Sequence, residues 1–520
     1  MMKPRTPTFW LIIFLAMVSL LRLAFIGKIP VTPDETYYWS WSTRPDLAYF
    51  DQPGMVAWIG WMANHLPHAP TVFTIRLPAV IIMALATIFA YACYQKLFDD
   101  QTEAILLAIA FNFTPIFFSL GIATIHDTAL ILFLTGFYWA AARLIKTPSP
   151  ATLRSPALSG TLRSTSANWT ILSLFLLGAL YSKLNAAIIA LSFTLYIFIS
   201  PFGRSQLRKP WVWISGLVCA LGFLPVIAWN QQRAWPQLLA TSQLVKKNGL
   251  DPGKIIETCA EYVVSQFGVY SPLIMLGMIA AIFAAVKHYR KTRDQRMLLL
   301  LTLSLPALFY FPLQSLRSPV FANWSLIAYF PLLVLFTRFS FDGFGKGKIL
   351  NNSFWKAAVA LAIIISVATL VETRFRLTRP LAWMVKDKLK LERPLDWRLD
   401  QEFEAWDQLK NFLDKNRMPE EKLSSRRYQI ASLMQFLLSD HPTPVVVPGG
   451  FKLSQYSLWT SPEELRQKSA IYVDTSPMPE RIRKCFAQVQ DLQAPLNVHR
   501  RGRLVKKFYI YRVYDYLSCP

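Results

Sequence analysis

The chain has 520 residues, of which 53% are hydrophobic and 14% aromatic, and its formal net charge is +24 at pH 7. This composition is too apolar for an ordinary soluble protein and favours a polytopic membrane protein. The positive charge does not indicate a nucleic-acid-binding protein, because the basic residues lie between apolar runs. Cytoplasmic loops and contact with anionic lipid headgroups explain most of the excess.

The N-terminus begins like a signal peptide, with Lys3 and Arg5 ahead of an apolar run. No small-x-small cleavage site follows, and the run approaches the roughly 20 residues needed to span a bilayer. We therefore expect a retained first membrane helix. Arg22, near the outer end of this helix, is expected to extend toward the lipid headgroups.

Further apolar runs follow and predict about eleven membrane helices. The runs lie near 8–27, 76–94, 104–122, 128–145, 168–182, 186–200, 211–229, 271–287, 297–313, 320–337 and 355–372. The predicted fold class is therefore a polytopic α-helical membrane protein, with a transmembrane domain over residues 1–372.

Lys and Arg gather in alternate connections, which predicts the orientation of the chain by the positive-inside rule. They concentrate at the N-terminus and near 143–163, 201–210, 287–296 and 346–348. These segments share one side of the membrane if the N-terminus is cytoplasmic. We expect a bacterial inner-membrane protein, with 147–167 as a cytoplasmic linker. Residues 28–75, the long loop 230–270 and the region after 372 then lie outside.

The region 373–520 changes character, because charged residues alternate with short apolar runs. Strand patterns occur at 445–447, 470–473 and 508–514, and helical patterns at 401–415 and 427–438. We expect a small extracytoplasmic α/β domain. Cys485 and Cys519 are able to pair if this region is extracytoplasmic, and the sequence leaves that open.

The most informative stretch is residues 31–54, VTPDETYYWSWSTRPDLAYFDQPG, which follows the first helix. It places Asp34, Glu35, Asp46 and Asp51 among aromatic residues, including Tyr37 and Tyr38. One interpretation is a wet loop with an interfacial aromatic belt. The other is an acidic active site that faces a lipid-borne substrate.

Three further features lie at helix ends on the same predicted side: His126–Asp127, Lys183 and Arg317. Charges at bilayer depth are costly and usually mark a pathway or a site. Each feature also has a plain structural alternative. Asp127 is able to cap the following helix, and the two cations are able to reach lipid headgroups.

Transfer of a sugar from a polyprenyl phosphate would require cations and a carboxylate of this kind. The phosphate leaves as an anion, so it needs cations such as Lys183 or Arg317 rather than a general acid. The acceptor hydroxyl needs one carboxylate as base, either Asp34 or Asp127. Asp34 and Glu35 are adjacent and point differently, so they do not flank one bond. The sequence identifies no cofactor with certainty. Asp34, Glu35 and Asp51 are candidate ligands of a divalent cation, and carboxylates alone leave that open.

At these residues the chain resembles a known family. PDETYYWSW and LAYFDQPGMVAW are similar to the first outer loop of bacterial members of the dolichyl-phosphate-mannose protein mannosyltransferase-like family. These are GT-C membrane glycosyltransferases and include aminoarabinose and galacturonic acid transferases acting on lipopolysaccharide. TIHDTALI, LYSKLNA, LPVIAWNQQRAW, ANWSLIAY, RYQIASLMQF and QYSLW also resemble family stretches.

The resemblance implies that Asp34 is the catalytic aspartate, that Asp127 helps to shape the site and that Lys183 lies near the donor phosphate. Two departures stand out. Where the family has HPP or KPP, this chain has Gln52-Pro53-Gly54, so a cationic or imidazole side chain is missing beside Asp51. His126 replaces a family proline and supplies another polar group or changes the acceptor.

We therefore expect an inverting membrane glycosyltransferase. Its donor would be a polyprenyl-phosphate sugar, and its acceptor a glycan, lipid or protein hydroxyl on the outer face of the membrane. The predicted substrate-binding residues are Glu35, Tyr37, Tyr38, Asp51, Gln52, His126, Lys183 and Arg317. The alternative is a transporter or flippase of lipid-linked sugars, which would favour mid-bilayer charges and paired halves. A catalytic soluble domain on a membrane anchor is a third reading, disfavoured by the number of helices.

Overall fold

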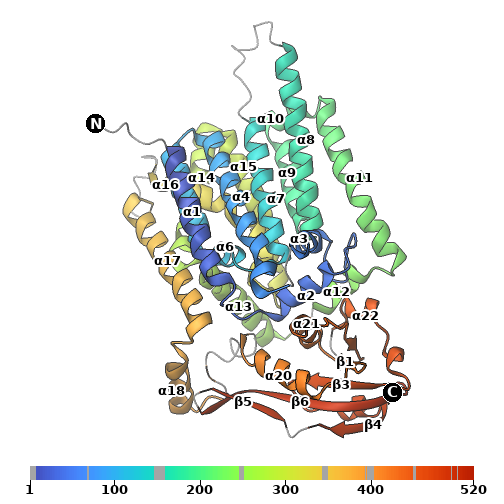
Figure 1. Cartoon of the computed structure of the whole chain (residues 1–520). Coiled ribbons are helices and arrows are strands. Elements are labelled where there is room, and N and C mark those ends of the chain that lie inside the picture. The colour runs from blue at the N-terminus through green and yellow to red at the C-terminus, as the bar shows by residue number, and fades with distance from the viewer. Residues whose placement is uncertain are drawn as a thin grey trace.

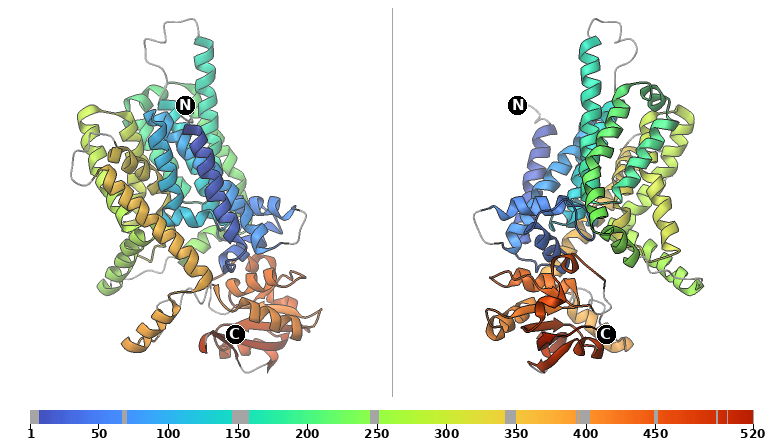
Figure 2. Two further views of the ribbon diagram at one scale, coloured as in Figure 1. Left: turned by 60° about the vertical axis from the view of Figure 1, so that its left-hand side comes forward. Right: turned by 90° about the vertical axis from the view of Figure 1, so that its right-hand side faces the viewer.

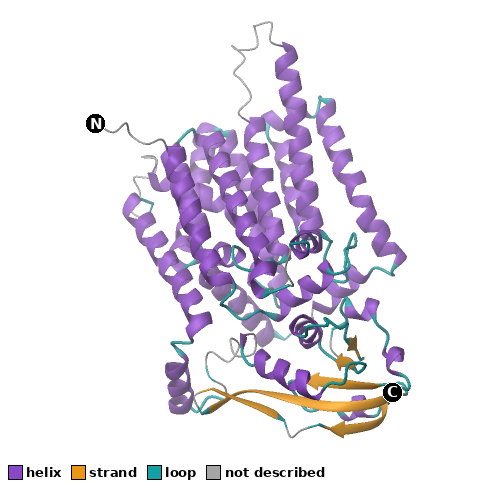
Figure 3. Ribbon diagram, in the orientation of Figure 1, coloured by secondary structure: helices purple, strands orange, loops and turns teal. Residues whose placement is uncertain are grey.

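A bundle of long helices stands on a smaller domain that carries the β-sheet in the computed structural model of the chain (Figure 1). The structure describes residues 7–66, 70–145, 158–244, 251–341, 350–392, 394, 403–448, 452–492, 495–500 and 502–519. Figure 3 shows that the bundle is built from helices and that the strands lie in the smaller domain.

Within the described residues, eight helices are long and apolar enough to cross a membrane, and three shorter apolar helices accompany them. The long spans are α1 (Pro7–Ile26), α4 (Val72–Phe98), α7 (His126–Ile145), α11 (Pro210–Gln232), α14 (Pro272–Thr292), α15 (Gln295–Ser315), η2 (Ala322–Ala328) with α16 (Tyr329–Phe341), and α17 (Asn352–Phe375). The shorter ones are α5 (Gln101–Phe113), the apolar part of α8 (Leu158–Ser182) and α9 (Ala186–Ile199). Each coincides with a predicted apolar run, which confirms a polytopic helical fold.

The predicted run 104–122 is divided. Helix α5 ends at Phe113, and the short helix α6 (Pro115–Leu120) begins after one intervening residue. Thr114 takes an extended conformation between them, with φ −62° and ψ 124°. Pro115 has no N–H to donate and disfavours a helical residue before it, so the break follows from the sequence.

The two basic connections that the structure describes in full, 201–210 and 287–296, lie at the end of the bundle where α1 begins. Helix α10 (Pro201–Gln206) is at this end in Figure 1. Arg296, which follows the turn after α14, donates a 3.0 Å hydrogen bond to the carbonyl of Leu97 at the end of α4. The sheet domain contacts the opposite end, as both views in Figure 2 show. The alternation of basic and non-basic connections in the sequence therefore corresponds to two ends of the bundle.

The predicted outer loops contain helices. Residues 28–75 form α2 (Pro33–Ser42) and α3 (Met55–Asn64), and residues 230–270 form α12 (Pro236–Leu244) and α13 (Pro252–Tyr270). The aromatic side chains of the first segment are buried rather than arranged as an interfacial belt: Tyr37, Tyr38, Trp39, Trp41, Tyr49 and Phe50. The interpretation as a wet loop is therefore wrong, because this segment is covered from both sides.

Two local predictions also change. Arg22 does not extend to the headgroups. It is buried and donates a 3.0 Å hydrogen bond to the Asn112 side chain. The predicted linker 147–167 is shorter, because α8 already begins at Leu158, and residues 147–157 lie outside the described part of the chain. The contact of Arg22 could not be predicted from hydropathy, since its partner lies on a neighbouring helix.

The C-terminal region folds around a mixed sheet, as its strand patterns predict. The strands are β1 (Lys422–Ser425), β2 (Val445–Val446), β3 (Ser469–Asp474), β4 (Phe486–Asp491), β5 (Leu496–Arg500) and β6 (Arg503–Tyr516), in the order β2-β1-β3-β6-β4, with β5 also paired to β6. β1 is parallel to β2 and β3, whereas β6 is antiparallel to β3, β4 and β5. The remaining helices are α18 (Arg379–Leu389), α20 (Trp406–Asn416), α21 (Tyr428–Leu437), α22 (Tyr456–Trp459), η4 (Pro462–Leu465) and α23 (Glu480–Arg483).

Helix α21 joins the two parts of the molecule. One face packs on the sheet through Leu433 and Met434. The other face contacts α2, where the Ser432 hydroxyl lies 2.9 Å from that of Thr36 and donates to the Pro33 carbonyl at 3.1 Å. Small hydroxyl residues at this crossing allow close approach and satisfy each other's hydrogen bonds. The first outer segment is therefore enclosed between the bundle and the sheet domain.

Cys485 and Cys519, whose pairing the sequence leaves open, form a disulfide that joins the start of β4 to the C-terminal region. Cys93, Cys219 and Cys259 are free. A disulfide that persists is typical of an extracytoplasmic compartment.

This pairing predicts a simple labelling pattern. Denatured, unreduced protein should react with a maleimide at Cys93, Cys219 and Cys259, and at Cys485 and Cys519 only after reduction. Cys485→Ser should expose one additional thiol without reduction, which provides the control. Labelling of Cys485 and Cys519 in unreduced wild-type protein would contradict the disulfide.

Candidate active site

A cavity of about 820 Å³ lies where the bundle, the first outer segment and the sheet domain meet. Its polar lining comes from parts of the chain far apart in sequence: Asp34, Tyr37, Tyr38, Asp51, Gln52, His126, Lys183, Asn185, Asn323, Tyr428 and Lys452. Its apolar lining includes Ile188, Leu191 and Leu195 of α9 and Pro306, Tyr310 and Phe311 of α15. Leu191, Leu195 and Tyr310 are themselves exposed, so the apolar part of the cavity is open rather than enclosed.

The start of α2 directs Asp34 into this cavity. Thr32 caps the helix by accepting a hydrogen bond from the Glu35 amide at 3.3 Å, and the Glu35 carboxylate accepts in return from the Thr32 amide at 3.0 Å. Pro33 occupies the first helical position, where its missing N–H costs nothing. The Asp34 side chain is exposed and lines the cavity. Successive helical residues point about 100° apart, so Asp34 and Glu35 face different surroundings.

Glu35 is buried on the other side of α2. Its two carboxylate oxygens accept hydrogen bonds from Arg76 Nε at 2.5 Å and Arg76 Nη2 at 2.7 Å. The same guanidinium donates to the carbonyls of Ile26, Ile29 and Pro30 at 2.7–2.9 Å. All five N–H donors of Arg76 are used, so this contact joins the end of α1, the start of α2 and the start of α4.

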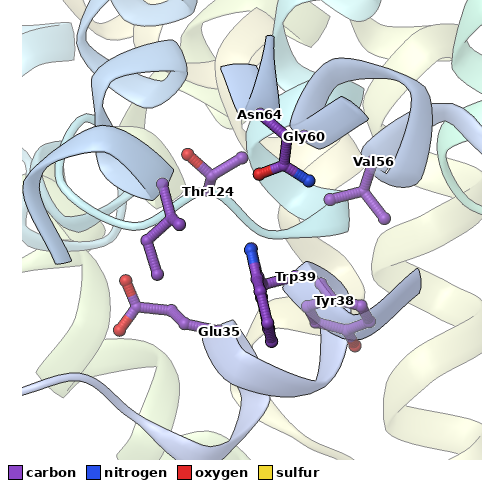
Figure 4. A pocket seen from close by; sticks show the side chains of 8 residues that line it. Glu35, Tyr38, Trp39, Val56, Gly60, Asn64 and Thr124 are labelled. Carbon is purple, nitrogen blue, oxygen red and sulfur yellow. The ribbon is translucent and has the colours of Figure 1, made fainter. Parts of the chain in front are cut away.

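Glu35 faces a second, much smaller cavity of about 10 Å³, shown in Figure 4. Trp39 of α2 and Val56 and Asn64 of α3 also surround it. This volume is close to that of one water probe and admits no sugar. Glu35 is therefore placed in a structural contact and not in the large cavity, where substrate binding had been predicted for it.

Directly behind the lining of the large cavity, Asp127 organises a polar cluster. Its Oδ1 accepts a 2.8 Å hydrogen bond from Lys183 Nζ, and its Oδ2 accepts one of 2.6 Å from Asn323 Nδ2. His126 Nε2 lies 3.3 Å from Oδ2. Asp127 is buried, whereas Lys183, Asn323 and His126 line the cavity. Asp127 thus holds the donors in place from behind.

A third cluster surrounds Asp51. The Tyr37 hydroxyl donates to Oδ2 at 2.6 Å, and Lys452 Nζ of the sheet domain donates to Oδ1 at 2.6 Å. Burial and the nearby Asp51 charge raise the pKa of Tyr37 well above its usual value, so this phenol stays protonated and remains a donor. Burial, followed by the charge of Asp34, has the same effect on the pKa of Tyr38.

The structure brings most of the predicted site residues together. Seven of them line the large cavity: Asp34, Tyr37, Tyr38, Asp51, Gln52, His126 and Lys183. Asp127 lies directly behind it. Arg317, in the exposed turn after α15, does not line the cavity, although Gln314 in the preceding turn does.

Sequence reasoning missed Asn323, Tyr428 and Lys452. Asn323 belongs to ANWSLIAY, and Tyr428 to RYQIASLMQF, two stretches noted for their family resemblance without a role. Lys452 precedes QYSLW, a third such stretch. Those resemblances were the available signal, whereas the contacts depend on how the two domains dock.

The carboxylates considered as metal ligands do not form one cluster. Glu35 pairs with Arg76, whereas Asp51 pairs with Lys452. Among the described residues, no three His, Cys, Asp or Glu side chains converge as a metal site would require. An ammonium group already occupies the position beside Asp51 that a cation would take, so these residues do not fit a divalent metal.

The helical bundle and its sheet domain define a membrane protein with the GT-C fold, and the family comparison agrees. Residues 51–229 match the family described as dolichyl-phosphate-mannose-protein mannosyltransferase, which confirms the resemblance predicted from the sequence. This match includes Asp51, His126–Asp127 and Lys183.

Two individual proteins are similar to this chain. The lipid A galacturonosyltransferase RgtD of Rhizobium johnstonii is 25% identical over 296 residues, which span 57% of this chain and 58% of that protein. In structure, ArnT from Cupriavidus metallidurans bound to undecaprenyl phosphate has a TM-score of 0.60 at 13% identity and covers 97% of this chain and 98% of that one. The second likeness concerns the fold of the entire chain, sheet domain included.

The Glu35–Arg76 contact predicts a stability effect. Glu35→Gln leaves the buried Arg76 guanidinium without its counter-charge, which typically costs about 3–5 kcal/mol. The thermal midpoint of purified protein in detergent should fall clearly. Asp34→Asn, one residue away on the exposed face, is the matched control and should melt like wild type. Equal midpoints for Glu35→Gln and wild type would show that the pair does not hold α2.

Proposed function

We propose that this chain is a membrane glycosyltransferase that moves a hexosyl or pentosyl group from a polyprenyl-phosphate donor to an acceptor hydroxyl. The observation that carries the proposal is the continuity of one cavity. Its apolar part is open and lined by residues of the apolar helices α9 and α15, and its polar part holds Asp34 and Lys183. A lipid-linked sugar phosphate likewise has an apolar chain at one end, followed by an anionic phosphate and a polar sugar ring.

The phosphate would be held by fixed donors. Lys183 is anchored by Asp127, which leaves its other N–H bonds directed to the cavity, and Asn323 is anchored in the same way. Donors that are already positioned stabilise charge without reorganisation during the reaction. Asp127 is accordingly a positioning residue in this proposal, rather than the base.

Asp34 would act as the general base. Its carboxylate takes the proton of the acceptor hydroxyl while the acceptor oxygen attacks the anomeric carbon. The bond from this carbon to the phosphate oxygen breaks, and its electron pair remains on the polyprenyl phosphate. One displacement of this kind inverts the anomeric configuration. The leaving phosphate needs no proton, so no general acid is required.

The proposed orientation puts the cavity on the outer face of a bacterial inner membrane, with the N-terminus in the cytoplasm. Two observations support it. The basic connections 201–210 and 287–296 lie at the end of the bundle where α1 begins, and the sheet domain at the opposite end holds the Cys485–Cys519 disulfide. In this arrangement residues 1–372 supply most of the transferase site, and residues 373–520 form the extracytoplasmic domain. Acceptors among glycans, lipids and proteins are all compatible with it.

The proposal predicts the loss of transfer in Asp34→Asn. A general base typically contributes about 10²–10⁴-fold to a rate, so label transfer from undecaprenyl-phosphate sugars to native-membrane acceptors should fall by at least about a hundredfold. Asp46→Asn, in the same segment but outside the cavity, is the control and should retain activity. Its carboxylate accepts from Trp229 Nε1 at 2.8 Å.

Turnover of Asp34→Asn at the wild-type rate would contradict its role as base. Binding of the donor by wild type without any transfer, unchanged by Asp34→Asn, would favour a carrier or flippase instead. A parallel reaction with chelator tests for a divalent cation. Activity is expected to persist, because Asp127 and Asp51 already have ammonium partners.

A further inference from the structure

We infer that Lys452 of the sheet domain is a second cation of the donor-phosphate site, so that the site is complete only when this domain is docked on the bundle. The inference rests on the proposed function, which it deepens. It is carried by the contact between Lys452 Nζ and Asp51 Oδ1 at 2.6 Å, within the lining of the large cavity.

The position of Lys452 is fixed by its surroundings and is not that of a mobile surface lysine. Asp51 is itself held by the Tyr37 hydroxyl. Three residues beyond Lys452, the Gln455 amide donates to the same hydroxyl at 2.8 Å, and the Gln455 side-chain oxygen accepts from the Phe50 amide at 2.7 Å. Lys452 therefore stands on a segment bonded to both sides of Asp51.

The packing beside this segment is equally specific. Tyr456, in the helix that follows, is fully buried, and its ring lies 6.0 Å from that of Tyr37. Tyr428 of α21 lies 4.4 Å from the same ring and also lines the cavity. Three aromatic rings thus join the two domains next to the ammonium group. Such a joint limits the positions that Lys452 can adopt.

The charge balance of the cavity gives Lys452 its role. Within the described residues, the charged side chains of its lining are Asp34, Asp51, Lys183 and Lys452, with His126 beside them. Gln52, which follows Asp51, is neutral. With Asp127 directly behind the lining, three carboxylates would face the single ammonium group of Lys183 if Lys452 were absent. Lys452 supplies a second ammonium group and so reduces the repulsion of an anionic donor. With it, each of Asp51 and Asp127 anchors one ammonium group toward the cavity.

An ammonium group has three N–H donors, and the contact with Asp51 uses one. The remaining donors are available to a phosphate oxygen in the cavity. Asp51 and Tyr37 act in this account as positioning residues. They hold the cation and do not themselves touch the reacting atoms.

The test is direct binding of undecaprenyl phosphate to the purified full-length protein, with undecaprenol as the uncharged comparison. Lys452→Gln should weaken undecaprenyl phosphate binding by about tenfold to a hundredfold, the usual worth of a charge-assisted hydrogen bond. Undecaprenol binding should not change. Lys452→Arg should restore most of the affinity, which loss of packing alone would not allow. Lys468→Gln, at an exposed site of the same domain, should bind like wild type.

The outcomes separate this inference from the proposed function. Wild-type protein that fails to prefer undecaprenyl phosphate over undecaprenol would overturn both. A wild-type preference that Lys452→Gln retains in full would overturn the role of Lys452 alone. Equal weakening by Lys452→Gln and Lys452→Arg, with a lowered thermal midpoint, would mean that the residue serves docking and not the phosphate.

Discussion

The buried ion pair between Glu35 and Arg76 is the contact on which the candidate site depends. Arg76 binds the carbonyls at the end of α1 and both oxygens of Glu35, so it fixes where α2 begins and how it is rotated. The rotation places the neighbouring Asp34 in the large cavity. A buried pair gives little net stability, but removing one partner is costly, so the geometry is strongly held.

The rest of the site follows one arrangement used twice. Asp127 anchors Lys183, and Asp51 anchors Lys452, within the lining of one cavity. In each case the carboxylate neutralises and orients a cation that is also exposed to the cavity. Buried or half-buried lysines need such partners, because desolvation would otherwise favour their neutral form. Asp34 lies in the same cavity lining, and its carboxylate side chain is exposed. The chemical distinction among the carboxylates therefore arises from their surroundings rather than from residue type.

Much of the bundle could be predicted from the sequence, because spanning helices are signalled by local hydropathy. All the predicted apolar runs correspond to helices, including the short run around Phe193. Asp34, Asp127 and Lys183 stood out as charges at helix ends. Arg22 was misread, since its partner Asn112 lies 90 residues away. The short helices α2 and α3 within 28–75 were also missed. The aromatic residues Tyr37 and Trp39 of α2 pack against Tyr428 and Phe436 of α21, a contact that the local sequence does not show.

Gln52, where the chain departs from the family pattern, shows most clearly what local sequence patterns do not predict. The family pattern has a cationic or imidazole side chain at this position, and the sequence alone shows only that this side chain is missing. Lys452, which pairs with Asp51, is 401 residues away from it and belongs to the other domain. No periodicity or spacing connects the two. Only the docking of α21 and the segment at 452–459 against α2 brings them together.

The measurement that tests the account most directly is an experimental structure of the protein with undecaprenyl phosphate bound. The account predicts that the phosphate lies between Lys183 and Lys452, close to Asp34, with the first isoprene units between α9 and α15. A phosphate bound elsewhere, for example beside the basic residues of α18 and β6, with the large cavity empty, would contradict it.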